Sequence, residues 1–288
     1  SQGKADKILV GFCRATPSGQ ILPAKRAKFG ITMKRFFISQ DKIKEGKAYF
    51  SREEAHHIIK VVRIKPGEKI FFFDGTGKEY SGIAGLDRKG ILFADITEER
   101  SPGEFKLPKI ALSQAIIKKD KMDFIVQKAT ELNVDTIIPL ISERCNVKKS
   151  NDALGRYVSR WRKIAVEASK QCGRSDIPTV LEPRNFLDAV KDASKNYAVS
   201  ILATLSGERL TLKDITGKNA PSSIMAFVGP EGDFSGEEIE IARGLDLKPV
   251  NICPTVLRSE TASIFILSVL NFAFLESNPE RIVLPDTT

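Results

Sequence analysis

The chain has little of the two residue types that most often bind metals or act as catalytic nucleophiles, with two histidines and four cysteines in 288 residues. His56 and His57 are adjacent in a stretch expected to be helical, where neighbouring side chains point about 100° apart, so they do not form a chelate. The cysteines lie far apart and contain no C-x-x-C pair (Cys13, Cys145, Cys172 and Cys253). This spacing disfavours a zinc site or a disulfide framework, and we expect no metal and free thiols in a reducing compartment.

Long apolar runs and the common nucleotide-binding motifs are also missing. The longest apolar stretch, 262–275, is interrupted by polar residues and is shorter than the roughly 20 residues of a membrane span. We therefore expect a buried terminal helix, no membrane partner and a cytoplasmic location. No G-x-G-x-x-G follows a strand, no G-x-S-x-G is present, and Gly75-x-Gly77-Lys78 lacks the glycine spacing of a P-loop. The absence of these motifs leaves a chain with few candidate catalytic side chains, which is typical of an enzyme whose cofactor brings the reactive group.

Acidic residues are fewer than basic ones, 36 against 45, which gives a formal net charge of +9. Residues 1–32 contribute much of the excess, with six basic side chains and one acidic. A moderate basic excess fits a nucleic-acid partner, although many proteins carry as much for solubility alone. Residues 1–32 have no clear apolar period, so we interpret them as a leader or non-native extension that precedes a folded chain beginning at Met33.

The rest of the chain divides into two regions with different patterns. Residues 33–104 predict short strands at 35–38, 69–73, 79–84 and 90–96 with one helix at 52–63, which suggests a small barrel or curled sheet. Residues 105–288 alternate strands and helices, with strands at 109–112, 134–141, 198–203, 224–228 and 250–252 and helices at 120–132 and 154–171. This alternation predicts an α/β domain with a parallel sheet covered on both faces.

Two loops in the second region are the strongest candidates for a ligand site. The segment 227–235 leaves a buried strand, turns through Gly229 and Pro230, and enters a helix whose start has the S-x-x-E spacing of a capping box at Ser235 and Glu238. The segment 256–262 follows a second strand and a proline turn, and it also enters a helix. Because loops at the carboxyl ends of parallel strands meet at one edge, they predict a crevice for a small polar ligand.

From Met33 onward the chain resembles the 16S ribosomal RNA (uracil-N3) methyltransferases of the SPOUT superfamily. The resemblance covers nearly all of residues 33–275, and it depends on the order and spacing of several short motifs together. These are His56-His57 with Val61-Val62-Arg63, Phe73-Asp74-Gly75, Gln127 to Leu132, Glu143-Arg144, Glu167-Ala168 with Gln171, Gly173 and Arg174, Gly229 to Gly232, and Leu257 to Ala262.

The resemblance implies an α/β SPOUT methyltransferase domain with a C-terminal trefoil knot, at about 200–275, preceded by a PUA-like β-barrel that binds RNA. The domain boundaries expected are 1–32, 33–104 and 105–288. It also implies S-adenosylmethionine as the cofactor, a homodimer, and small-subunit ribosomal RNA or the assembled 30S particle as the partner. Sequence rules alone would not predict a knot, because true knots are rare.

The resemblance also implies which residues form the site. Arg258 and Arg174 are expected to stabilise the uracil anion or a flanking phosphate, and Glu260 to accept a proton or orient a group. Glu260 could equally favour the amino end of the last helix, and Arg258 could pair with Glu231 or Glu260. The expected cofactor-binding residues are Leu202, Thr204, Leu205, Val228, Gly229, Pro230, Glu231, Gly232, Ile252, Pro254, Val256, Leu257, Ser259, Thr261 and Ala262.

The chain departs from the family's commonest pattern at three places. Asp233 stands where glycine is frequent, Cys253-Pro254-Thr255 replaces a turn containing glycine and arginine, and Ser259 replaces threonine. A side chain at Asp233 could restrict the approach of the backbone to the cofactor.

Two other functions stay open: a non-catalytic RNA-binding or ribosome-assembly protein, and a SPOUT methyltransferase with another target nucleotide. The retained loop glycines favour catalysis, because a pure binder needs no cofactor crevice.

Overall fold

The computed structural model describes residues 35–101, 108–145, 151–206, 210, 212–216 and 221–276. The described residues all belong to one compact unit. The predicted leader therefore lies outside the described residues, and so does the predicted boundary at 104/105. None of the helices in the described ranges is long and apolar enough to cross a membrane.

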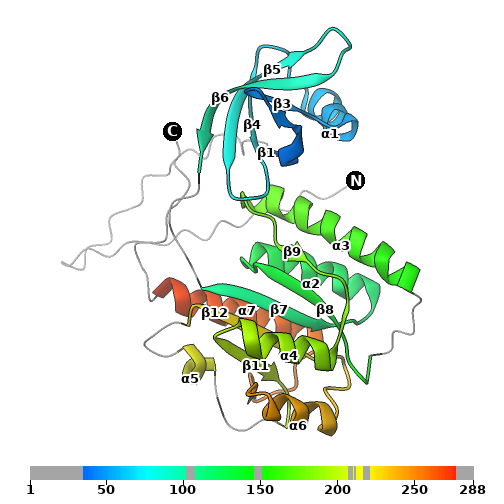
Figure 1. Cartoon of the computed structure of the whole chain (residues 1–288), viewed down its shortest axis with the longest axis vertical. Coiled ribbons are helices and arrows are strands. Elements are labelled where there is room, and N and C mark those ends of the chain that lie inside the picture. The colour runs from blue at the N-terminus through cyan, green and yellow to red at the C-terminus, as the bar shows by residue number, and fades with distance from the viewer. Residues whose placement is uncertain are drawn as a thin grey trace, which may run out of the picture. The chain divides into compact units, whose positions relative to one another are not determined.

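The first described region is a curled six-stranded sheet with strand order β1-β4-β5-β6-β3-β2 (Figure 1). β1 pairs with β4 in parallel and the other pairs are antiparallel. Its core is built from alternating residues of the strands, among them Phe36, Ile70 and Phe72. The strands are β1 (Arg35–Phe37), β2 (Ile43–Lys44), β3 (Lys47–Tyr49), β4 (Lys69–Phe73), β5 (Glu79–Leu86) and β6 (Leu92–Arg100), and a 3-10 turn, η1, spans Gln40–Lys42.

Four of these strands confirm the sequence prediction, while the β2–β3 hairpin was not predicted. Its strands have two and three residues, too few for an alternating pattern to be visible. The predicted helix at 52–63 is present in two parts, α1 (Arg52–His56) and a π-helical turn, η2 (His57–Val62). The Ser51 hydroxyl accepts a hydrogen bond from the backbone N–H of Glu54 and so caps the amino end of α1.

The second region is a seven-stranded parallel sheet with strand order β10-β8-β7-β12-β11-β13, and β9 also pairs with β8. Alternation of strands and helices requires crossover connections, and these favour parallel pairing. The predicted strands are all present, within a few residues of the expected ends. The strands are β7 (Lys109–Ala115), β8 (Thr136–Ile141), β9 (Thr179–Val180), β10 (Arg184–Asn185), β11 (Val199–Ala203), β12 (Ser223–Val228) and β13 (Lys248–Val250).

Helices cover both faces of this sheet (Figure 1). One face packs against α2 (Lys119–Glu131), α3 (Asn151–Cys172), α5 (Leu212–Thr216) and α7 (Ser259–Glu276), with Trp161, Leu267 and Leu270 in the core between them. The other face packs against α4 (Phe186–Asn196) and α6 (Gly236–Gly244), around Phe227 and Phe234. Each large apolar side chain buried in this way contributes about 1.5–3 kcal/mol. No element was predicted between 174 and 197, where the two-residue strands β9 and β10 and the helix α4 lie.

The curled sheet contacts the loop between α3 and β9. The backbone N–H of Gly77 donates to the Ser175 carbonyl at 3.1 Å, and the N–H of Ile177 donates to the Gly75 carbonyl at 3.0 Å. Gly75 has φ +83°, and a Cβ there would lie 2.9 Å from Ile177 Cδ1. The Asp74–Gly77 turn, which connects β4 and β5, therefore needs glycine at position 75 for both its conformation and its close contact.

Candidate active site at the carboxyl edge of the parallel sheet

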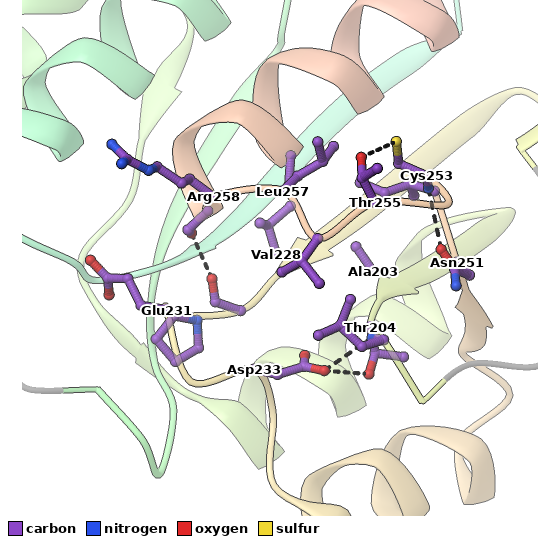
Figure 2. Close-up of a pocket in the computed structure, with 17 residues that line it drawn as sticks. Ala203, Thr204, Val228, Glu231, Asp233, Asn251, Cys253, Thr255, Leu257 and Arg258 are labelled. Atoms are coloured by element: carbon purple, nitrogen blue, oxygen red, sulfur yellow. Dashed lines mark hydrogen bonds between the residues drawn. The ribbon is translucent and has the colours of Figure 1, made fainter.

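Three neighbouring strands end at the same level of the parallel sheet. Ala203, the last residue of β11, is paired with Val228 at the end of β12 and with Val250 at the end of β13. The loops that follow these strands consequently start side by side. Together with the start of α7 they enclose a cavity of about 230 Å³ (Figure 2). The two bends near residues 230 and 255, which we expected to share a hollow, both line this cavity.

Most of the expected cofactor-binding residues lie on the wall of this cavity. Its apolar part comes from Val228, Ile252 and Leu257, and its polar part from side chains and exposed backbone of the turns. The expected residues on the wall are Thr204, Leu205, Val228, Gly229, Pro230, Glu231, Ile252, Val256, Leu257, Ser259 and Ala262.

Four expected residues do not line the cavity. Leu202 is fully buried on the other face of the sheet, because neighbouring residues of a strand point to opposite faces. Pro254 and Thr261 are exposed outside it. A Cβ at Gly232 would meet the side chain of Arg144, 3.5 Å away at Cδ, so this glycine faces an arginine.

Five lining residues were not among the expected ones: Ala203, Asp233, Asn251, Cys253 and Thr255. All five are neighbours in the chain of expected residues, so the segments were predicted correctly but not each side chain. Asn251 Oδ1 accepts a hydrogen bond from the backbone N–H of Cys253, which shapes the β13–α7 loop. A hydrogen bond with the Thr255 hydroxyl lowers the pKa of the Cys253 thiol.

A buried polar network joins the floor of the cavity to α7. The Ser259 hydroxyl, at the first residue of α7, donates to the Gly229 carbonyl at 2.6 Å and accepts from the Gln114 amide at 2.9 Å. The Ser263 hydroxyl bonds to the other end of the same amide. Gln114 and Ser263 are fully buried, so these contacts satisfy groups that would otherwise be costly. The Ser259 hydroxyl is consequently used within the protein, and this residue contributes to the wall through its remaining atoms.

Charged residues lie at one end of the cavity. Arg258 precedes α7, is exposed, and forms no ion pair with the described residues. Figure 2 shows its side chain extending away from Val228 and Leu257, on the side where the Glu231 carboxylate also lies. The alternative pairing of Arg258 with Glu231 or Glu260 is thus absent from this part of the chain.

The cation that pairs with these two carboxylates is Lys121, a residue that was not predicted from the sequence. Lys121, in the first turn of α2, bonds to Glu231 at 3.1 Å and forms an ion pair with Glu260 at 3.4 Å. Its hydrogen bond to Glu231 raises the pKa of Lys121, so the lysine stays cationic at neutral pH. Burial alone would raise the pKa of Glu231, but a backbone hydrogen bond and Lys121 lower it. The geometry places one cation between two carboxylates beside the cavity.

Arg174 lies at the opposite edge of the sheet. Its guanidinium donates to the carbonyls of Thr130 and Val134, which precede β8, and forms an ion pair with Asp176 at 2.6 Å. Burial would raise the pKa of Asp176, but hydrogen bonding and the charge of Arg174 lower it. Within one chain Arg174 does not reach the cavity, and its contacts give it a structural role at the end of α2. The catalytic role expected for Arg174 stays a prediction.

Similarity to known proteins identifies the class to which this fold and site belong. A family model described as an RNA methyltransferase domain matches residues 104–271, and one described as an RNA methyltransferase PUA domain matches residues 50–93. A methyltransferase of Legionella pneumophila, solved in complex with S-adenosylmethionine (SAM), has a TM-score of 0.76 and 31% identity, covering 84% of this chain and 98% of that one. The chain is an RNA methyltransferase with a PUA-like domain ahead of a SPOUT domain, and the knot stays a prediction.

The particular family follows from two further relatives. Ribosomal RNA small subunit methyltransferase E of Aquifex aeolicus is 32% identical over 237 residues, 81% of this chain and 97% of its own length. The Neisseria gonorrhoeae enzyme of the same name, solved bound to SAM, has a TM-score of 0.71 and 28% identity over 83% of this chain and 97% of that one. This chain belongs to the ribosomal RNA small subunit methyltransferase E family.

Proposed function

We propose that this protein transfers a methyl group from S-adenosylmethionine to N3 of a uridine in 16S ribosomal RNA. The observation that carries the proposal is the single cavity formed by the loops after β11, β12 and β13 in a member of this methyltransferase family. Because the substrate is ribosomal RNA, or the assembled 30S particle, we place the reaction in the cytoplasm.

The residues of the cavity fit the proposed cofactor. Val228, Ile252 and Leu257 offer apolar surface to an adenine ring, and the turns beside Gly229 and Asn251 offer backbone groups to its polar edge. Two acidic residues, Glu231 and Asp233, also line the cavity and give it a negative potential that suits a cationic ligand, although their carboxylates also bond to protein groups. When bound, S-adenosylmethionine supplies an activated methyl group on its sulfonium.

The charged group beside the cavity suits the uracil. N3 of uracil carries a proton that has to leave, and negative charge develops on the ring as it does so. Arg258 is exposed at the cavity and without an ion-pair partner in the described residues, so it is available to stabilise that charge. Glu260 is the candidate to accept the proton or orient the base, and Lys121 holds it beside Glu231.

A homodimer is part of the proposal, and the outer face of α7 supports it. Thr261, Phe265, Ser268 and Phe272 recur at intervals of three or four residues and are all exposed. Phe272 is 60% exposed, Phe265 38%, and Phe124 of the adjoining α2 43%. Aromatic side chains gathered on one face usually mark an interaction surface, and a second copy of this chain is the occupant that we propose.

Calorimetric titration with SAM, followed by mapping of methylated bases, tests this function. We expect saturable binding of SAM, and we expect 16S RNA from a strain without the gene to lack one N3-methyluridine that the purified protein restores. Absence of binding at high SAM concentration would favour the alternative of a non-catalytic RNA-binding protein. Restoration of a different methylated nucleotide would favour the other alternative, a SPOUT enzyme with another target.

A further inference from the structure

Asp233 occupies an unusual conformation in the loop between β12 and α6. Its φ is +60°, in the left-handed region that few residues other than glycine, asparagine and aspartate adopt readily. Its backbone N–H donates to the Pro230 carbonyl at 3.1 Å, and its carboxylate accepts from the N–H of Phe234 at 2.8 Å. These local bonds hold the side chain in one direction, toward the neighbouring loop after β11 (Figure 2).

The carboxylate of Asp233 connects two of the three loops that form the cavity. Its Oδ2 accepts from the Thr204 hydroxyl at 2.9 Å and from the Leu205 backbone N–H at 3.0 Å. The Thr204 hydroxyl accepts from the Ser206 N–H at 3.3 Å, so its one proton is directed to Asp233. Thr204, Leu205 and Asp233 all line the cavity. The bonds therefore fix a part of the wall that a glycine at position 233 would leave unconnected.

These contacts show what the aspartate adds at a position where glycine is frequent in the family. A glycine would adopt the same φ without strain but would provide no acceptor for Thr204 and Leu205. The aspartate does not project across the cavity to exclude a ligand, because its two oxygens are used by Thr204, Leu205 and Phe234. An ordered loop loses less conformational entropy on binding than a free one.

We infer that Asp233 is a positioning residue, which joins the β11 and β12 loops so that the cofactor cavity is formed before the cofactor binds. The inference rests on the proposed function, because the ligand concerned is SAM. Asp233 acts through Thr204 and Leu205, and it is not itself placed at the reacting atoms.

Calorimetric and kinetic comparison of Asp233→Gly and Asp233→Asn with the unaltered protein tests the inference. We expect Asp233→Gly to weaken the binding of SAM and of S-adenosylhomocysteine alike by about ten-fold, and to raise KM for SAM with little change in kcat. Asparagine keeps one acceptor oxygen and should give a smaller loss. The matched control is Asp246→Gly, because Asp246 is an exposed aspartate with φ +62° that does not line the cavity.

A double-mutant cycle with Thr204→Val separates this role from simple destabilisation. If Asp233 acts through Thr204, the loss in Asp233→Gly/Thr204→Val is smaller than the product of the two single losses. Independent effects, unchanged affinity in Asp233→Gly, or a loss confined to SAM with normal binding of S-adenosylhomocysteine would each overturn the inference. Absence of SAM binding by the unaltered protein would instead reject the proposed function.

Discussion

Arg258 is the residue that we most expect to take part in methyl transfer. It is an exposed cation at the wall of the cavity, and the carboxylates of Glu231 and Glu260 are bound to Lys121. We expect Arg258→Ala to lower kcat for methyl transfer by about 10²–10³-fold, because a positioned charge would be lost from the transition state. Transfer of labelled methyl groups to 16S RNA lacking the modification measures this. Arg243→Ala, on the surface of α6, should keep full activity, and equal activity of both variants would remove Arg258 from the site.

A second prediction for a single residue concerns Lys121. Without its cation, Glu231 and Glu260 lose the group that holds them together. We expect Lys121→Met to reduce kcat/KM by about ten-fold, because charge-assisted bonds of this kind contribute roughly 1.5–3 kcal/mol. The neighbouring exposed Lys119, replaced by methionine, is the matched control. An unchanged kcat/KM in Lys121→Met would show that methyl transfer does not depend on the contact between Lys121 and Glu260.

Individual side chains were the hardest part of the site to predict from sequence. The glycine and proline turns identified the loops because such residues restrict or free the backbone in ways that are visible locally. Lys121 and Asp233 depend on contacts across the fold, 110 and 29 residues away along the chain. The contacts of Arg174 with the carbonyls of Thr130 and Val134, 44 and 40 residues away along the chain, could not be predicted from its motif either.

Among the elements, α6 begins with a terminus that several hydrogen bonds hold. Glu238 is 6% exposed and accepts hydrogen bonds from the backbone N–H of Ser235, the Ser142 hydroxyl and the backbone N–H of Glu143. One side chain thus completes the predicted capping box and also fixes the loop after β8. The sequence could predict the first contact, because capping is local, but not the second.

We expect Glu238→Ala to lower the free energy of unfolding by about 2–4 kcal/mol, because it removes the cap and leaves buried donors without acceptors. Urea denaturation followed by circular dichroism measures the change. Glu237→Ala, at the exposed neighbouring position, should alter stability by no more than about 0.5 kcal/mol. A similar small change in both variants would mean that the loop after β8 is held by other contacts.

For the molecule as a whole, the sequence predicted the class of each region but not every element. Periodicity identified α3 and the strands of the parallel sheet, since these are long or strongly apolar. The short strands β2, β3, β9 and β10 have two or three residues each, and pairing partners decide their structure. The expected knot and the boundary at 104/105 stay predictions.

The proposed dimer leads to a prediction for the whole molecule. We expect Phe272→Glu, on the outer face of α7, to shift sedimentation from dimer to monomer, because a charge would have to be buried at the interface. Leu187→Glu is the matched control, since Leu187 is 42% exposed on α4, which covers the other face of the sheet. A dimer that persists in Phe272→Glu at micromolar concentration would locate the contact elsewhere.

The bond between Ser259 and Gly229 has a consequence for how the protein is made. The floor of the cavity is fixed by Gln114 on β7, by the turn after β12 and by the first residue of α7. A nascent chain that ends shortly after this turn contains Gly229 but lacks Ser259, the donor to its carbonyl. We therefore expect a nascent chain that stops short of residue 259 to lack the buried contacts that fix the floor of the cavity.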